Sequence, residues 1–285
     1  MTNLLISATD LRSIVEQGAN ALDGLEGINA VSWYETGRRT ARLEAYPIDE
    51  AAAQAAVGVL ALQVPELKVS ITPFDDEDWV KMSLEGLPPV RAGSFFVCGS
   101  HDLPRRRTGK RVVRIEAAEA FGTGHHGTTK GCLLELDRMA KSGTRPKRVL
   151  DVGTGSGVLA LGAARLGAFA LGTEIDARAA AVAVTHVKQN GLRGRVQIVV
   201  ADGMKRVDLR AQKPFDLVFA NILMKPLIRL APDLVARMAP AGKLVLSGLL
   251  QHQEPAVRRA YESRGLVMVS RTRLEGWATL VLRRP

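Results

Sequence analysis

The sequence has few of the residues that stabilise secreted, metal-binding or membrane-embedded proteins. Only two of its 285 residues are cysteines, and neither has the neighbours that metal ligation requires, which argues against a disulfide framework and against a zinc site. The N-terminus lacks a basic segment followed by a signal-length apolar run, and no later apolar run is long enough to span a bilayer. We therefore expect a cytoplasmic protein without membrane segments.

Acidic residues are also in deficit. Lys and Arg outnumber Asp and Glu by 39 to 29, which gives a formal net charge of +10. This charge predicts either an anionic partner, such as RNA, or simply a soluble enzyme with a basic surface. The basic segment PRRRTGKR at 104–111 lacks the interleaved aromatics that stack on bases, so a solvated surface is favoured there, and contact with RNA or the ribosome stays open.

The first part of the chain predicts a small α+β domain over residues 1–74. Its pattern indicates strands at 3–7, 31–35, 40–46 and 68–73, with helices at 8–22 and 50–64. The order βαββαβ is typical of a split-βαβ, or ferredoxin-like, sandwich. Residues 75–115 are irregular, with an acidic run and a proline pair, and we expect them to form a linker that carries a few short strands.

Residues 116–285 predict a second domain in which strands and helices alternate. The expected strands are 148–152, 170–175, 196–201, 215–220 and 243–249, and the expected helices are 157–166, 177–190, 226–238 and 252–264. Near-continuous apolar strands such as LVFA and KLVL indicate a parallel sheet that is covered on both faces. The tail, 265–284, predicts an antiparallel strand pair with Gly276 near its turn. The fold class is therefore α/β, with a Rossmann-like sheet.

The most informative stretch of this domain is RVLDVGTGSGVLA, at 148–160. An apolar strand runs into Gly153, Gly155 and Gly157 and then into a helix, so the backbone can turn sharply and approach a ligand at a helix N-terminus. A dinucleotide-binding fingerprint would place its last glycine at Val158. The spacing Gly-x-Gly-x-Gly resembles instead the class I methyltransferase motif, which binds S-adenosylmethionine.

Acidic residues follow the neighbouring strands. Glu174 stands seventeen residues beyond Gly157 at the end of the next strand, where a carboxylate accepts bonds from ribose hydroxyls. Asp176 is better explained as a helix N-cap. Asp202 follows the third strand and either contacts the adenine or caps a turn. Asp151, in the strand that leads into the glycine loop, completes the acidic candidates for cofactor binding.

Four segments together resemble one family. They are 75–93, AFGTGHHGTT at 120–129, ANILMKPL at 220–227 and LSGLL at 246–250, and they are similar to the PrmA family of class I lysine methyltransferases. This family modifies L11, a ribosomal protein of the large subunit. The resemblance implies S-adenosylmethionine as the cofactor, a large-subunit ribosomal protein as the substrate, recognition of that substrate by the N-terminal domain, and a monomer.

The resemblance also implies roles for single residues. Phe121, Thr123, Gly124 and Thr129 should border the methionine and ribose of the cofactor, while Gly153, Glu174 and Asn221 match further cofactor-binding positions. Asn221 is also our catalytic candidate, because its amide at the end of a strand can orient the amine that accepts the methyl group.

Two departures from the family pattern bear on the substrate. His125, His126 and Gly127 stand where the family usually has Thr-His-Pro, and Met224 and Lys225 replace a small residue followed by Gly. The adjacent histidines lack spaced carboxylates or cysteines, so we expect no metal. These departures leave other targets open, namely another protein's lysine, an RNA base or a small amine. The Asn-Pro-Pro-Tyr signature of base methylation is absent at Asn221. A non-catalytic ribosome-assembly or RNA-binding factor is the alternative of a different class.

Overall fold

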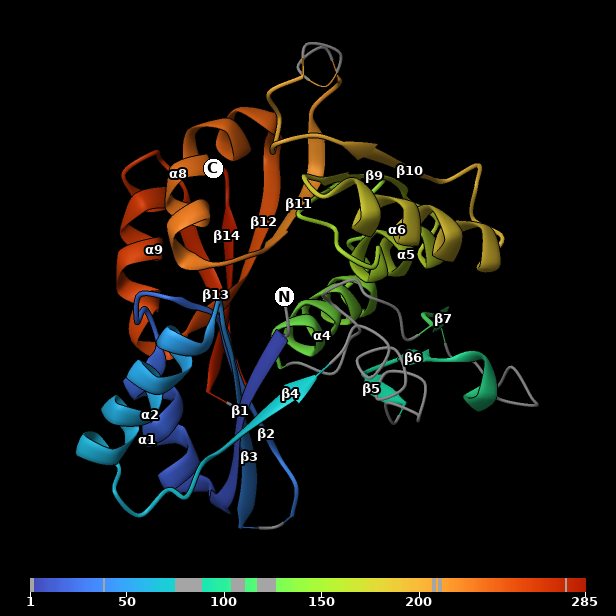
Figure 1. The fold of residues 1–285 in the computed structure, drawn as a ribbon. Coiled ribbons are helices and arrows are strands. Elements are labelled where there is room, and N and C mark those ends of the chain that lie inside the picture. Colours follow the sequence, from blue (N-terminus) through green and yellow to red (C-terminus); the bar gives the residue numbers. More distant parts are fainter. Residues whose placement is uncertain are drawn as a thin grey trace. The chain divides into compact units, whose positions relative to one another are not determined.

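The structure, a computed structural model, describes most of the chain as two compact units. The described residues are 3–37, 39–74, 89–103, 111–116, 127–206, 209, 212–274 and 276–285. The first unit is Met1–Met82 and the second is Ser83–Pro285 (Figure 1). In the described residues, no helix is both long enough and apolar enough to cross a membrane.

The first unit is a four-stranded antiparallel sheet with two helices packed on one face. Its elements are β1 (Asn3–Leu11), α1 (Arg12–Leu22), β2 (Ile28–Glu35), β3 (Thr40–Pro47), α2 (Glu50–Gln63) and β4 (Ser70–Phe74). The strand order is β2-β3-β1-β4. Ile6, Leu43 and Leu60 are fully buried between the sheet and the helices. The predicted βαββαβ order is confirmed, and with it the ferredoxin-like fold of this unit.

The first helix begins later than its sequence indicates. We expected a helix from Ala8, but β1 continues to Leu11, with Ala8 opposite Leu43 and Leu11 opposite Thr40 in an antiparallel pair. Pairing with β3 satisfies the backbone groups of residues 8–11, and this tertiary contact overrides a local pattern that also suits a helix.

The second unit is built on a seven-stranded sheet with the order β10-β9-β8-β11-β12-β14-β13. Its strands are β8 (Arg148–Val152), β9 (Phe169–Glu174), β10 (Val196–Val200), β11 (Phe215–Asn221), β12 (Met238–Leu250), β13 (Val267–Leu274) and β14 (Trp277–Arg283). The pairs from β10 through to β12 are parallel. β14 is antiparallel to β12 and to β13, and Gly276 lies in the turn that precedes it. This is the predicted Rossmann-like sheet with its antiparallel C-terminal pair.

Helices cover both faces of this sheet. They are α4 (Gly127–Lys141), α5 (Val158–Arg165) and α6 (Ala177–Gln189) on one face, and α8 (Met224–Arg237) and α9 (Glu254–Glu262) on the other (Figure 1). Because successive side chains of a strand point to opposite faces, Val149 packs into the core under α4 and α5, while Leu150 packs into the core under α8 and α9. This double burial explains the near-continuous apolar strands.

A small three-stranded sheet adjoins the first of these cores. It consists of β5 (Val90–Ala92), β6 (Phe95–Cys98) and β7 (Arg111–Arg114), in that order, and a short 3-10 helix, Ser100–Asp102, follows β6. Phe95, Val97 and Val113 are buried with side chains of α4 and α5. The short strands that we expected in the linker are therefore part of the second unit.

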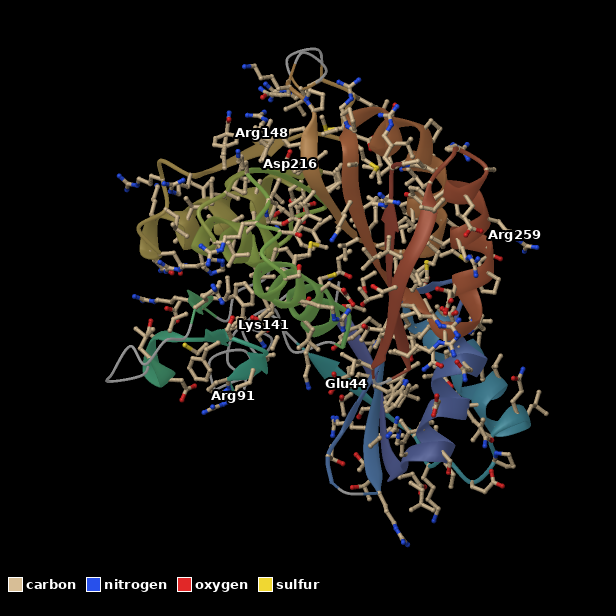
Figure 2. All side chains as sticks on the ribbon, turned by 180° about the vertical axis from the view of Figure 1, so that it is seen from behind. Glu44, Arg91, Lys141, Arg148, Asp216 and Arg259 are labelled. Carbon is tan, nitrogen blue, oxygen red and sulfur yellow. The ribbon has the colours of Figure 1, made fainter. Side chains whose placement is uncertain are left out.

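At the amino ends of β8, β9 and β11 the strands are tied together. The Arg148 guanidinium lies 5.5 Å from the Phe169 ring centroid and 5.2 Å from that of Phe215. An Asp216 carboxylate oxygen accepts the backbone N–H of Arg148 at 2.9 Å. Figure 2 labels the side chains of Arg148 and Asp216 at this end of the sheet. These contacts fix the strands at this end, so the opposite, carboxyl ends project from a rigid sheet.

Candidate functional site

A glycine loop joins β8 to α5 at the carboxyl edge of the sheet. Gly153, Gly155 and Gly157 have φ values of 68°, 52° and 84°, which lie in the left-handed region that side chains with a Cβ rarely adopt. A Cβ on Gly153 would come within 2.4 Å of Cγ2 of Ile222. Glycine is therefore required at Gly153 both by the backbone conformation and by the space available.

Hydrogen bonds that the loop donates to β9 hold the loop in this shape. The backbone N–H groups of Gly153 and Thr154 donate to the Thr173 carbonyl at 2.8 and 3.0 Å. The N–H of Gly155 donates to Glu174 Oε2 at 2.8 Å, and the other carboxylate oxygen accepts the N–H of Ile175 at 2.8 Å. Glu174 is 8% exposed, so its carboxylate is fixed beside the loop at the carboxyl end of β9.

Asp151 supports the loop from the core side. Its side chain is buried, and Oδ2 accepts a hydrogen bond from the Thr154 hydroxyl at 2.6 Å and from the N–H of Ala160 at 3.2 Å. Burial raises the pKa of Asp151 to about 6, although the two hydrogen bonds oppose this shift and the nearby Glu174 adds to it. Both of these contacts are within the protein, and direct contact between Asp151 and a cofactor stays a prediction.

The two remaining acidic candidates lie at the ends of neighbouring elements. Asp176 caps α6 by accepting the N–H of Arg178 at 2.8 Å, as predicted. Asp202, just beyond β10, forms an ion pair with Lys205, and the hydrogen bond from Lys205, together with the charges of Lys205 and Arg229, lowers the pKa of Asp202. A contact from Asp202 to an adenine stays a prediction.

Asn221 is the last residue of β11 and pairs in register with Ser247 of β12. Its Nδ2 donates to the Thr129 hydroxyl at 3.3 Å. Thr129 is buried in the first turn of α4, so α4 begins beside the carboxyl end of β11. Because α4 already includes Gly127, both Thr128 and Thr129 lie within the helix and not at its N-cap.

The sequence did not lead us to the hydroxyl groups of Ser247 and Thr279, which hold the elements around Asn221 together. Ser247 is fully buried, and its Oγ lies 2.9 Å from Thr279 Oγ1, 3.2 Å from the Ala278 carbonyl and 3.4 Å from the Thr128 carbonyl. The only signal in the sequence was a serine inside the apolar segment LSGLL. These bonds connect β12, β14 and α4 around Asn221.

Most of the described candidates lie along one edge. The glycine loop, Glu174, Asp202 and Asn221 follow the carboxyl ends of β8, β9, β10 and β11, which are adjacent in the order β10-β9-β8-β11. From β8 the chain adds β9 and β10 on one side of the sheet, and then β11 and β12 on the other side. Ligands of open α/β sheets bind at such a switch point, between β8 and β11. Lys225 is exposed in the first turn of α8, just beyond Asn221.

Some predicted residues lie outside the described residues. They are Phe121, Thr123, Gly124, His125 and His126, together with most of the basic segment at 104–111. In the ranges that the structure describes, no group of three or more potential metal ligands occurs. The described residues fit a nucleoside, because the glycines admit close approach to the loop backbone and Glu174 and Asp202 offer acceptors for hydroxyl and amino groups.

Comparison with known proteins matches this chain to one family. The model of the family described as Ribosomal protein L11 methyltransferase (PrmA) matches residues 6–285. A ribosomal protein L11 methyltransferase of Caulobacter sp. is 43% identical over 285 residues, which cover 98% of this chain and 97% of the relative. A protein of the same name from Bradyrhizobium diazoefficiens is 50% identical over 209 residues, which cover 73% of this chain and 70% of the relative.

A solved structure shows a related fold. The crystal structure of the ribosomal protein L11 methylase from Lactobacillus delbrueckii subsp. bulgaricus is 26% identical and superposes with a TM-score of 0.61. The match covers 69% of this chain and 99% of that one.

Proposed function

The chain belongs to the ribosomal protein L11 methyltransferase (PrmA) family, and on that premise we propose that it transfers methyl groups from S-adenosylmethionine to lysine amino groups of ribosomal protein L11. The observation that carries this proposal is the arrangement at the carboxyl edge. There a glycine loop held by Glu174 and an asparagine held by Thr129 follow adjacent strands.

The β8–β9 side of the edge is proposed to hold the cofactor. The backbone of 153–157 would contact it closely, Glu174 would accept hydrogen bonds from the ribose hydroxyls, and Asp202 would contact the adenine. When bound, S-adenosylmethionine supplies an electrophilic methyl group on a good leaving group. The protein's main task is then to align the amine with that group, and alignment alone lowers the barrier by several kcal/mol.

Asn221 is proposed to orient the acceptor amine. Because its Nδ2 is engaged by Thr129, its Oδ1 is directed away from that contact and can accept a hydrogen bond from an amino group. A lysine with a pKa of about 10.4 must lose a proton before it attacks. The polar groups that hold this corner are the hydroxyls of Thr129, Ser247 and Thr279, which carry no charge and do not stabilise the ammonium form.

We propose that the first unit recognises the protein substrate. Removing it tests this role, and the truncation should begin at Ser83, because Phe95 and Val113 belong to the core of the second unit. The 83–285 variant should bind S-adenosylmethionine while methylating L11 poorly. Full activity of this variant on L11 would exclude a recognition role for the first unit.

The proposed function is tested with purified protein, labelled S-adenosylmethionine and a cell lysate, followed by mapping of the label by mass spectrometry. We expect label on lysines of L11. Label on another protein, on RNA or on a small amine would change the substrate but keep the chemistry. If calorimetry detects no binding of the cofactor, a non-catalytic ribosome-assembly factor becomes the better explanation. A monomeric state, a cytoplasmic location and contact with the ribosome or with RNA through the basic surface stay predictions.

A further inference from the structure

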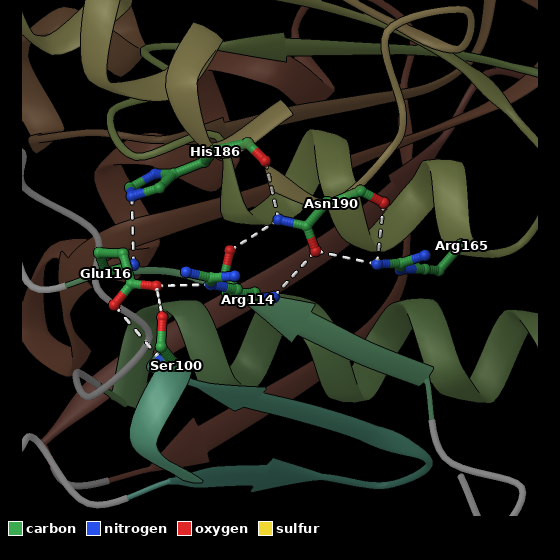
Figure 3. A network of polar contacts seen from close by, with 6 residues as sticks. All are labelled: Ser100, Arg114, Glu116, Arg165, His186 and Asn190. Carbon is green, nitrogen blue, oxygen red and sulfur yellow. Dashed lines mark hydrogen bonds and ion pairs between the residues drawn. The ribbon is translucent and has the colours of Figure 1, made fainter. Parts of the chain in front are cut away.

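His186 is a buried histidine that none of the roles above uses. It lies in the last turn of α6 and is 2% exposed. Its Nδ1 is 2.8 Å from the carbonyl oxygen of Ser156, inside the glycine loop. Its Nε2 accepts the backbone N–H of Glu116 at 3.2 Å (Figure 3). One imidazole ring therefore joins the glycine loop to the segment that follows β7.

These two partners fix the protonation state of the ring. A carbonyl needs a donor, so Nδ1 carries the proton, and an N–H needs an acceptor, so Nε2 carries none. Protonation of Nε2 would set two N–H groups against each other and break the bond to Glu116. Burial lowers the pKa of His186, and this outweighs the bond to the Ser156 carbonyl and the charge of Glu116, which raise it. Among the residues that the structure describes, the charge of Arg114 also faces the ring and also lowers this pKa.

Asn190, one helical turn beyond His186, binds the backbone of Arg114, at the end of β7 just before Glu116. Its amide accepts the N–H of Arg114 at 2.9 Å and donates to the Arg114 carbonyl at 2.7 Å, as a neighbouring strand would (Figure 3). Arg165 of α5 donates to the same amide oxygen at 2.9 Å. The edge of β7 that faces α6 is thus occupied by side chains of α5 and α6, and the position of Glu116 relative to His186 is well defined.

Two ionisable side chains consequently bind the backbone of the glycine loop directly, in addition to Asp151, which binds the Thr154 hydroxyl. Glu174 accepts the N–H of Gly155, and His186 donates to the carbonyl of Ser156. We propose that His186 is a positioning residue of the cofactor site: in its neutral form it joins the Ser156 carbonyl to the Glu116 N–H, and protonation of Nε2 breaks the bond to Glu116, detaches the glycine loop from the segment that follows β7 and weakens cofactor binding. This inference rests on the proposed function, since it takes the loop to be the cofactor site.

The test measures the affinity of the full chain for S-adenosylhomocysteine by calorimetry as a function of pH. His186→Gln keeps a donor and an acceptor but does not titrate, whereas His186→Leu has neither. Thr185→Ala is the matched control, because this exposed hydroxyl bonds only within α6, to the Ala181 carbonyl at 3.1 Å. Titration of the ligand and of Asp151 is common to all four proteins and cancels when their profiles are compared.

Because the pKa of His186 lies below the ordinary histidine value, its titration falls on the acid side of that value. From about pH 7.5 down to about pH 5 we expect the Kd of the wild type and of Thr185→Ala to rise about five- to tenfold more than that of His186→Gln. At pH 7.5, His186→Leu should bind about five- to tenfold more weakly than His186→Gln.

Two results would overturn this inference. If wild type and His186→Gln bind with parallel pH profiles, His186 does not control the loop, although the proposed function stands. If the wild type fails to bind at pH 7.5, the proposed function is lost and this inference with it. Circular dichroism of each variant shows whether a loss of binding reflects unfolding.

Discussion

The two halves of the carboxyl edge hold their side chains in place with different chemistry. On the β8–β9 side, the glycine loop is shaped by three buried ionisable residues, Asp151, Glu174 and His186. On the β11–β12 side, Asn221 and Ser247 are held by uncharged hydroxyls. A carboxylate beside an acceptor lysine would stabilise its ammonium form, so a neutral environment suits amine attack. We therefore expect the first half to govern cofactor binding and to respond to pH, and the second half to govern turnover without such a response.

The largest effect should come from removing the Asn221 side chain on the β11–β12 side of the carboxyl edge, which we call the neutral half. Asn221→Ala should lower kcat on L11 about 100- to 1000-fold, the range seen when a positioned hydrogen-bonding group is lost from a transition state. The affinity for S-adenosylmethionine should change much less. Steady-state kinetics combined with calorimetry separates the two quantities.

Variants of Thr129 provide the control for Asn221. Thr129→Ser keeps the hydroxyl that binds Nδ2 of Asn221 and should remain close to wild type, whereas the isosteric Thr129→Val should lose part of kcat. A loss that falls entirely on cofactor affinity would show that Asn221 serves only as the cofactor-binding residue that the family resemblance also implies, and does not orient the amine.

A somewhat smaller effect should follow from removing a carboxylate on the β8–β9 side of the edge, which we call the charged half. Glu174→Ala removes the acceptor of the Gly155 N–H and the proposed acceptor of the ribose hydroxyls. We expect the Kd for S-adenosylmethionine to rise about 10- to 100-fold, because hydrogen bonds to charged groups contribute about 1.5–3 kcal/mol each. Calorimetry at pH 7.5 measures this change. Unaltered affinity would remove Glu174 from the site.

Asp151, in the charged half, should make the free energy of unfolding depend on pH. Its folded pKa of about 6 lies above the ordinary value of 3.8, so its contribution to stability is fully present below the ordinary value and is lost as pH rises through 6. Asp151→Asn has no such loss. The variant should gain up to about 2 kcal/mol relative to wild type between pH 4 and pH 7.

Urea unfolding at the two pH values measures this difference for Asp151→Asn. Asp176→Asn removes another carboxylate near the glycine loop while keeping a helix-capping side chain, and it serves as the control. A stability difference between Asp151→Asn and wild type that does not change with pH would contradict the assignment.

The smallest effect should come from the hydroxyls of the neutral half. Ser247→Ala removes the hydroxyl that contacts Thr279, Ala278 and Thr128, and should lower the free energy of unfolding by about 1–2 kcal/mol. Because hydroxyls do not titrate in this range, the loss should be equal at pH 6 and pH 8. A double-mutant cycle with Thr279→Val measures the coupling within the pair. A loss that varies with pH would show that a titratable group also participates.

Several features of this protein follow from short stretches of sequence. The Gly-x-Gly-x-Gly spacing after an apolar strand predicted the turn, because residues with a Cβ rarely adopt the positive φ values found at 153, 155 and 157. Glu174 and Asp176 were predicted at a strand end and a helix start, since both positions depend on neighbours close in sequence. Residues 8–11 were assigned wrongly to a helix, because their strand conformation depends on pairing with β3, about thirty positions away along the chain.

The sequence by itself therefore determined the order of the elements, the covered parallel sheet and the residues of the glycine loop. Only the tertiary structure showed that Thr129 binds Asn221, 92 positions away, and that His186 joins Ser156 to Glu116, 30 and 70 positions away. The physical reason is that hydrogen bonds require atoms to meet within about 3 Å. Whether they meet is decided by strand register and helix packing, which no local pattern of residues encodes.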